Sequence, residues 1–163
     1  MKLDIGCGLH WKEPLNEWTH LDINPNTHIE IVCDFGNIPV PDGSVEAIHL
    51  GDVIEHIQIY RQYDVLEEWR RIAQIGCVVT GTTPNIDSVM KRYARGELSL
   101  KDALIPNIYG WNDRPTEHHF INFTKETLTA LFKKHGFEVT DFSGSPGPSD
   151  EPHWLVFKGR RVA

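Results

Sequence analysis

Residues 2–8 read KLDIGCG, and the rest of the chain is interpreted outward from this stretch. Residues 2–5 have the composition of a short strand, and Gly6 and Gly8 then form a turn. Because neither glycine carries a Cβ atom, the backbone of this turn can approach a ligand closely. A strand that ends in such a turn is typical of a nucleotide site at the carboxyl edge of a parallel sheet.

Two acidic residues follow at the ends of the next two predicted strands. Asp22 lies in residues 21–23 (LDI), and Asp34 ends residues 31–34 (IVCD). An acid at the end of the second strand can accept hydrogen bonds from both hydroxyls of a ribose. The acid after the third strand can reach an adenine amino group. The three strand ends together predict a nucleoside site.

The size and charge of the chain limit its function further. At 163 residues it is expected to form one domain, residues 1–163. The net charge is −7 and no long Lys/Arg cluster exists, so a nucleic-acid partner is not expected. No apolar run reaches membrane-spanning length and no leader is visible, which predicts a cytoplasmic protein without a membrane partner. The three cysteines are expected to be reduced and buried rather than paired or bound to zinc.

The remaining pattern alternates strands and helices. Residues 9–18 are too few for a normal crossover helix, so a loop or one helical turn is expected there. Further on, strands are predicted over 45–50 and 77–82, helices over 63–75 and 125–135, and a closing antiparallel hairpin over 137–143 and 154–158. This order predicts an α/β sheet with an antiparallel edge.

Residues 85–117 interrupt that pattern. They contain one predicted helix, 86–95, and otherwise loop. Long segments of this kind often cover a binding site. We therefore expect residues 85–117 to form a substrate-covering insertion, in which the aromatic residues Tyr93, Tyr109 and Trp111 serve packing or substrate contact equally well.

The motifs occur in a specific order: DIGCG, LDINP, CDFGNIPVPDGSVEAIHLGDVIEHI, TGTTPN and HHFINFTKETLTALFKKHGFEV. In this order and spacing they resemble the class I S-adenosylmethionine-dependent methyltransferases, most closely the type 11-like branch. The resemblance covers nearly the whole chain. It implies a Rossmann-like, doubly wound, mostly parallel seven-stranded sheet with an antiparallel C-terminal hairpin. The first crossover helix would be shortened or absent.

The resemblance also assigns cofactor contacts. The glycine turn would hold the methionine part, Asp22 the ribose, and the following positions the adenine and the sulfonium side. The implied cofactor-binding residues are Asp4, Gly6, Cys7, Gly8, Asp22, Ile23, Asp34, Phe35, Leu50 and Gly51. The chain departs from the family pattern at His10, where a third glycine is common, and it lacks the usual helical cap before the first strand.

A nicotinamide-dinucleotide site is the other nucleotide interpretation. It requires G-x-G-x-x-G, but the third glycine position is Trp11. The helix that should open on that motif has no room in residues 9–18. The methyltransferase interpretation is therefore favoured.

Two groups of residues are candidates for chemistry. Asp52, Glu55 and His56 have the i, i+3, i+4 spacing of one helical face, which suits helix capping by the acids and a packed histidine. With His118 they also look like the magnesium or manganese site of small-RNA terminal 2′-O-methyltransferases. A divalent metal is thus an alternative, but it is not favoured.

His118 and His119 follow the covering segment. They are either surface residues or a general base near the transferred methyl group, since an imidazole titrates near neutral pH. The candidate catalytic residues are therefore His118, His119 and His56.

The function expected from the resemblance is O-methylation of a small-molecule or glycan-like acceptor with S-adenosylmethionine as cofactor. One alternative is an inactive methyltransferase-like binding or scaffold subunit, because the cap and the first crossover helix are missing. The other is a metal-dependent O-methyltransferase that acts on RNA or a small molecule. The sequence predicts no oligomeric state.

Overall fold

The computed structural model describes residues 1–8, 17–111, 116–144 and 153–163. Two features expected from the sequence lie outside this part of the chain. One is most of the short connection between the first two strands, with His10 and Trp11. The other is the loop that joins the two strands of the closing hairpin.

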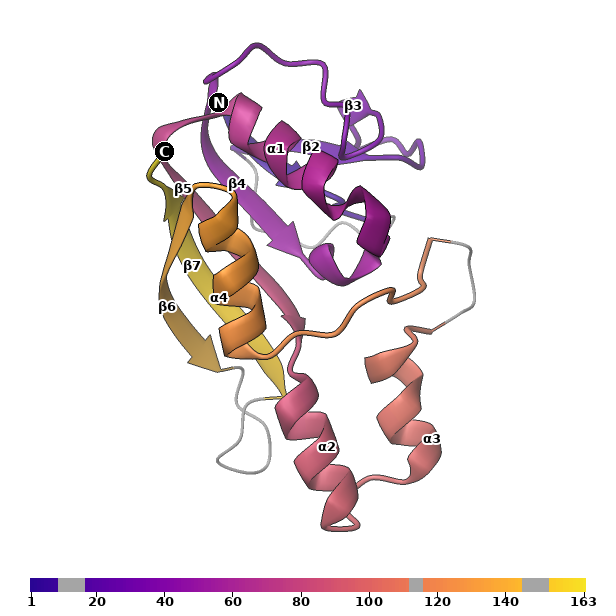
Figure 1. Ribbon diagram of the computed structural model, residues 1–163. Helices are drawn as coiled ribbons and strands as arrows, with labels where there is room; N and C mark the ends of the chain where they lie inside the picture. The colour runs from indigo at the N-terminus through magenta and orange to yellow at the C-terminus, as the bar shows by residue number, and fades with distance from the viewer. Residues whose placement is uncertain (9–16, 112–115, 145–152) are drawn as a thin grey trace.

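One seven-stranded sheet carries the fold, and its strands run in the order β3-β2-β1-β4-β5-β7-β6 (Figure 1). The first five strands in this order are parallel, whereas β7 is antiparallel to both β5 and β6. The strands are β1 (Lys2–Ile5), β2 (Thr19–Asp22), β3 (Ile31–Val32), β4 (Val45–Gly51), β5 (Ala73–Pro84), β6 (Phe137–Gly144) and β7 (Trp154–Arg161). The predicted α/β class with an antiparallel terminal hairpin is confirmed. The strand order reverses at β1 and β4, where doubly wound sheets bind their ligands.

Two helices cover one face of this sheet. Helix α1 (Gln62–Ile72) and helix α4 (Lys125–Lys134) both lie in front of the sheet in Figure 1. Their apolar residues join the strands in one core, because the inward side chains recur at helical spacing. The buried members include Leu3, Ile5, Ile48, Val65, Leu66, Trp69, Leu128, Phe132 and Phe157.

The ends of these helices follow from local chemistry. Thr124 caps α4 through a reciprocal capping box with Thr127, as its position before the apolar pattern predicts. Gly136 follows with φ +78°, which ends the helix. Helix α1 was predicted to reach residue 75 but ends at Ile72, because Ala73 already pairs with Val45 as the first residue of β5.

The segment after β4 corrects one prediction. Asp52 has φ +55°, which lies in the left-handed region and not in the extended conformation typical of an N-cap residue. Only a short 3₁₀ helix, Ile54–His56, follows, and its N-cap residue Val53 makes no side-chain cap. The expectation that Asp52 caps a helix and shares a helical face with Glu55 and His56 is therefore wrong.

Residues 85–117 leave the sheet at the carboxyl end of β5. Helix α2 (Ile86–Ala94), where a helix was predicted, extends below the sheet edge, and α3 (Leu100–Asp102) and the helical turns Ala103–Ile108 run back alongside it (Figure 1). The described part of the segment from residue 116 then returns to the sheet edge and leads into α4. None of the helices in the described ranges is long and apolar enough to cross a bilayer.

Candidate active site

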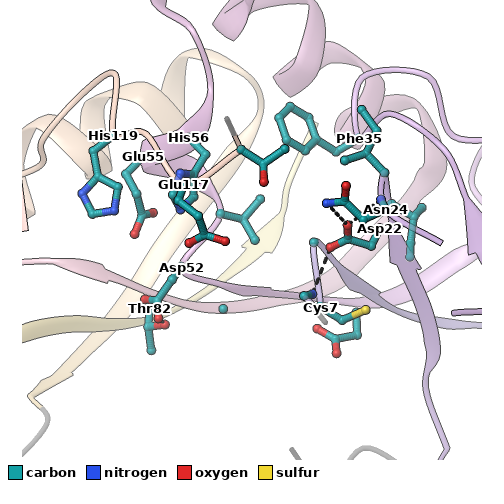
Figure 2. Close-up of a pocket in the computed structure, with 18 of the residues that line it drawn as sticks. Cys7, Asp22, Asn24, Phe35, Asp52, Glu55, His56, Thr82, Glu117 and His119 are labelled. Carbon is teal, nitrogen blue, oxygen red and sulfur yellow. Dashed lines mark hydrogen bonds between the residues drawn. The ribbon is translucent and has the colours of Figure 1, made fainter. Parts of the chain in front are cut away.

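A cavity of about 890 Å³ lies at the carboxyl edge of the parallel strands. Figure 2 shows two groups of side chains at its opposite ends. We call one the glycine-turn end, formed by Gly6, Gly8, Asp22 and Phe35. We call the other the histidine end, formed by Glu55, His56 and His119. Because all seven residues line the same cavity, one ligand or a pair of ligands can contact both ends.

The backbone of the glycine turn has a conformation that glycine adopts more readily than other residues. Gly6 and Gly8 have φ values of +66° and +75°, which side chains disfavour. A Cβ atom on Gly6 would lie 2.7 Å from Cγ2 of Val53, so the turn also packs tightly against the segment after β4. The backbone N–H groups of Gly6 and Cys7 donate to the carbonyl of Leu21, at 2.7 and 3.2 Å. The turn is thereby fixed to β2.

Asp22 lies at the carboxyl end of β2 and connects the turn to the next loop. Its Oδ2 accepts from the N–H of Gly8 at 2.9 Å, and its Oδ1 accepts from the backbone and side-chain nitrogens of Asn24, at 2.8 and 3.2 Å. His28 holds the other side of the turn, because its Nε2 contacts the carbonyl of Gly8 at 3.1 Å and must donate to it. Sequence analysis assigned no site role to Asn24, although it belongs to the LDINP motif, and did not identify His28, which lies outside the motifs.

Asp34 has a partner that the sequence did not reveal. Strand β3 ends at Val32, so Asp34 lies in the turn that follows, where both carboxylate oxygens accept from Arg61, at 3.0 and 2.6 Å. These bonds hold the pKa of Asp34 below its ordinary value. The guanidinium of Arg61 also lies 5.7 Å from the ring centroid of Phe35. Asp34, Phe35 and Arg61 therefore form one charged and aromatic wall of the cavity.

The structure places most, but not all, of the other predicted cofactor-binding residues at the cavity. Asp4, Cys7, Ile23 and Gly51 line the cavity, whereas the side chain of Leu50 is fully buried in the core and does not. Burial, reinforced by Asp4, raises the pKa of the Cys7 thiol to about 12. Cys7 is therefore protonated near neutral pH and is a wall of the cavity, not a nucleophile.

The histidine end contains a buried acid without a partner. Glu55 is only 1% exposed, and among the described residues neither of its carboxylate oxygens has a hydrogen-bond partner. The hydroxyl of Thr83, which lies nearby, is outside hydrogen-bond geometry. Burial raises the pKa of Glu55 to about 8, and the negative charge of Asp52 adds to this effect. An unpaired buried acid is costly, so it marks this end as a site for a ligand.

Two imidazoles stand beside Glu55 with defined orientations (Figure 2). Nδ1 of His56 contacts the carbonyl of His118 at 2.9 Å, and Nδ1 of His119 contacts the carbonyl of Asn107 at 2.8 Å. Because a carbonyl can only accept, each Nδ1 carries the proton, and each Nε2 is left as an acceptor in the neutral ring. Burial lowers the pKa of His119, which favours this neutral form.

The ligand atoms of Glu55, His56 and His119 lie within 4.8 Å of one another. The side chain of His118 is exposed and does not line the cavity, so only its backbone takes part. Asp52 lines the cavity, but its Oδ1 already accepts from the hydroxyl of Thr82 at 2.7 Å. The structure thus groups His119 with Glu55 and His56, where the sequence pattern had grouped Asp52 and His118 with them.

Gly110 allows His119 to reach this position. It has φ +74°, and a Cβ atom there would lie 1.9 Å from the carbonyl oxygen of Glu117 and 3.0 Å from the ring of His119. The N–H of His119 donates to the carbonyl of Tyr109 at 3.2 Å, and that of Phe120 donates to the carbonyl of Glu55 at 2.8 Å. The tight contact at Gly110 was not predicted, because it depends on how residues 110 and 117–119 pack together and not on a local sequence pattern.

An aromatic wall completes the histidine end. It is formed by side chains from the covering segment, the loop after it and β7, namely Pro106, Trp111, Phe120 and Trp154. The side chain of Trp111 is 65% exposed, so it offers a ring face to a ligand in addition to any packing. Of the three aromatic residues noted in the segment, only Trp111 lines the cavity.

Solved structures with the same fold were found by comparison. A methyltransferase from Methanosarcina mazei, described as SAM-dependent, superposes with a TM-score of 0.67 at 16% identity, over 98% of this chain and 91% of that one. An S-adenosylmethionine-dependent methyltransferase from Mesorhizobium loti gives 0.65 at 16% identity, over 98% and 89%. The 1,6-didemethyltoxoflavin-N1-methyltransferase of Burkholderia thailandensis, solved with its acceptor and S-adenosylhomocysteine, gives 0.66 at 12% identity, over 99% and 70%.

These likenesses establish the class of fold. The chain has the fold of S-adenosylmethionine-dependent methyltransferases, as the resemblance in its motifs predicted. No protein-family model matches the sequence, and no curated protein is significantly similar to it.

Proposed function

We propose that this protein is an S-adenosylmethionine-dependent methyltransferase of the type 11-like branch, which methylates an oxygen of a small-molecule or glycan-like acceptor. The observation that carries the proposal is that one cavity joins the glycine-turn end to the histidine end. A nucleoside-shaped site at the strand ends thereby lies next to unpaired groups that can receive a proton. Methyl transfer requires this combination of binding and deprotonation.

The residues at the glycine-turn end fit the cofactor. Gly6 and Gly8 keep the backbone of the turn free of side chains, and Asp4 and Cys7 lie beside it for the methionine part. Asp22 is held rigidly in the cavity and retains acceptor capacity for ribose hydroxyls. The side chain of Ile23 is 52% exposed and, with Phe35, provides apolar surface for adenine. Asp34, fixed by Arg61, can accept from the adenine amino group.

S-adenosylmethionine supplies a methyl group on a sulfonium, which leaves as a neutral thioether when the methyl carbon is attacked. The chain must hold the acceptor oxygen in line with that carbon at about 3 Å. The oxygen forms the new C–O bond, the C–S bond breaks toward sulfur, and the hydroxyl proton passes to Nε2 of His56 or His119. We assign contact with the acceptor oxygen to the histidine end, through His56 and His119.

The aromatic wall suggests the kind of acceptor. Trp111 and Phe120 present ring surface, which stacks on the flat faces of sugars and aromatic rings. Asp52 and Glu117 line the same part of the cavity and can accept hydrogen bonds from hydroxyl groups. A wall that combines rings with carboxylates suits a polyhydroxylated or phenolic small molecule.

Calorimetry with S-adenosylmethionine and S-adenosylhomocysteine tests the cofactor assignment. The parent protein should bind both, and Asp22→Ala should lose about 1–3 kcal/mol of binding free energy, because buried donors lose their acceptor. Asp141→Ala, at an exposed position of β6, is the matched control and should bind like the parent. If the parent bound neither compound, the chain would be an inactive scaffold subunit and the proposal would fail.

A radiolabelled-methyl screen then tests the acceptor. Sugars, glycosides, phenols, ring nitrogen compounds and short RNA should be incubated with the labelled cofactor. Label in an oxygen of a small molecule or glycan supports the proposal. Label only in nitrogen or only in RNA would overturn the acceptor class while leaving the methyltransferase assignment intact.

A further inference from the structure

The histidine end has a property that proton transfer alone does not explain. Glu55 lines the cavity and is buried at this end, and neither of its carboxylate oxygens is hydrogen-bonded by any residue in the part of the chain that the structure describes. A buried carboxyl group without hydrogen bonds is destabilising, and proteins retain one where a ligand compensates for it. The compensating group must be able to bind an oxygen donor that faces the cavity.

The two histidines beside Glu55 are oriented in the way that metal ligands are. Metal-binding histidines usually donate one ring N–H to a backbone carbonyl or a carboxylate, which fixes the tautomer and directs the other nitrogen to the metal. His56 and His119 both do this, through the carbonyls of His118 and Asn107. Their rings stand edge to face with centroids 4.8 Å apart beside Glu55, and in each ring Nε2 is the nitrogen that does not contact the carbonyl.

We propose that Glu55, His56 and His119 bind one divalent first-row transition metal ion in the cavity. Bonds of about 2.0–2.2 Å at tetrahedral angles would place the three ligand atoms roughly 3.3–3.6 Å from one another. In the structure these atoms lie within 4.8 Å of one another, so metal binding requires the side chains to move closer together, by up to about 1.5 Å between a pair of ligand atoms. Two imidazoles and one carboxylate favour Mn²⁺, Fe²⁺, Co²⁺ or Zn²⁺ over Mg²⁺, which prefers oxygen ligands.

Three protein ligands leave coordination positions open toward the cavity. An acceptor hydroxyl that binds there becomes more acidic, so its proton passes to water before or during methyl transfer, and no strong base is required. An ion with five or six ligands would have at least two positions left and would select acceptors with adjacent oxygen atoms that can both bind it. This part of the inference rests on the proposed methyltransferase function, whereas metal binding itself does not.

Co²⁺ alone is the probe for the site, because its visible absorption reports the ligands and geometry. Parent protein freed of metal with a chelator should take up one Co²⁺ per chain, measured by calorimetry and by the absorption band. Glu55→Gln keeps the shape of the side chain but removes its charge, and His119→Ala removes a ligand. Each should weaken Co²⁺ binding at least about tenfold and change the absorption band, while thermal unfolding without metal shows that both variants are folded.

His118→Ala is the matched control, since its side chain lies outside the cavity and its backbone carbonyl is retained. It should bind Co²⁺ like the parent. The site is overturned if the parent binds no more Co²⁺ than the Glu55→Gln/His119→Ala double variant. It is equally overturned if His118→Ala loses as much affinity as His119→Ala.

Catechol and phenol test the open positions on the Co²⁺-loaded parent. Catechol, with two adjacent oxygens, should shift the Co²⁺ absorption at lower concentration than phenol. Equal effects would overturn the acceptor class without affecting the metal site. Cofactor binding, measured in the same chelator-treated protein, should persist. Co²⁺ binding without any cofactor binding would instead reject the proposed function and leave the metal site standing.

Discussion

The two ends of the cavity treat their acidic residues in opposite ways. At the glycine-turn end, Asp22 accepts hydrogen bonds from Gly8 and Asn24, and Asp34 is paired with Arg61. At the histidine end, Glu55 is more deeply buried, and no described residue forms a hydrogen bond with its carboxylate. The acids of the glycine-turn end are already hydrogen-bonded without a ligand, so this end can bind one through its shape and further hydrogen bonds. The acid of the histidine end is not, so the stability and chemistry of that end depend on the group that binds there.

The two ends also differ in how far apart their residues lie in the chain. The glycine-turn end uses the ends of neighbouring parallel strands, which the topology brings together. The histidine end joins the 3₁₀ helix Ile54–His56 to Asn107, in the helical turns Ala103–Ile108, and to the loop around His119, more than 50 residues later. Substitutions at the glycine-turn end should therefore affect cofactor binding, and substitutions at the histidine end should affect methyl transfer.

The largest effect is expected at His119. His119→Ala removes a group that contacts the acceptor oxygen, directly or through an ion, and should lower the transfer rate constant by about 10²–10⁴-fold. Its affinity for S-adenosylmethionine should remain within about twofold of the parent value. Single-turnover kinetics and calorimetry on the same preparation measure both quantities.

His118→Ala is the companion measurement for that prediction, because it changes the neighbouring histidine without altering the cavity. Its rate constant should stay close to that of the parent. A larger loss for His118→Ala than for His119→Ala would show that the sequence grouping, and not the structural one, describes the active histidine.

Gly110→Ala should have the next largest effect. The new Cβ atom would collide with the carbonyl of Glu117, so the loop that carries His119 must shift. We expect a loss of about 1–3 kcal/mol in the free energy of unfolding and a marked loss of transfer, with cofactor binding retained. Denaturant unfolding and transfer assays provide the measurements.

Gly96→Ala is the control that distinguishes the effect of the collision in Gly110→Ala from the free-energy cost of a left-handed backbone conformation. Gly96 has nearly the same φ, +73°, but a Cβ atom there would meet nothing within 4 Å. It should cost only the left-handed strain of about 1–2 kcal/mol and leave transfer unchanged. If both variants lost transfer equally, Gly110 would have no specific role in positioning His119.

A smaller effect is expected at the adenine wall. Arg61→Met removes the guanidinium that holds Asp34 and stacks near Phe35, while keeping much of the apolar side chain. Cofactor affinity should fall by about 0.5–1.5 kcal/mol, because Asp34 is no longer fixed in place. Arg160→Met, which breaks the exposed pair with Glu138, is the control and should leave affinity unchanged. Equal cofactor affinities for the parent and Arg61→Met would show that the contact between Arg61 and Asp34 does not contribute to cofactor binding.

The contrast between the ends explains what sequence could predict. Strand ends, the glycine turn, Asp22 and the capping of α4 depend on local patterns, so the fold and most of the glycine-turn end were predictable. The left-handed Asp52, the Arg61 partner of Asp34 and the contact at Gly110 depend on tertiary packing. The choice between His118 and His119 was also not predictable, because neighbouring residues in a loop can face opposite sides.

The smallest effect concerns acid stability, and it should arise from the partnered acids. Asp34 and Glu68 tie the loop before β4 to α1, since Asp34 accepts from Arg61, and Glu68 accepts from Arg71 and from the N–H of Ile38. Their arginine partners, above all, hold the pKa values of both carboxyl groups below their ordinary values. Below about pH 5 the unfolded chain therefore binds protons that the native state does not, so stability falls as the pH drops.

Glu68→Gln should reduce this loss of stability by about 1 kcal/mol between pH 6 and pH 3, since the pair is only partly buried. Urea unfolding across this range measures the slope, and an unchanged slope in Glu68→Gln would show that the bonds of Glu68 to Arg71 and to Ile38 do not contribute to acid stability.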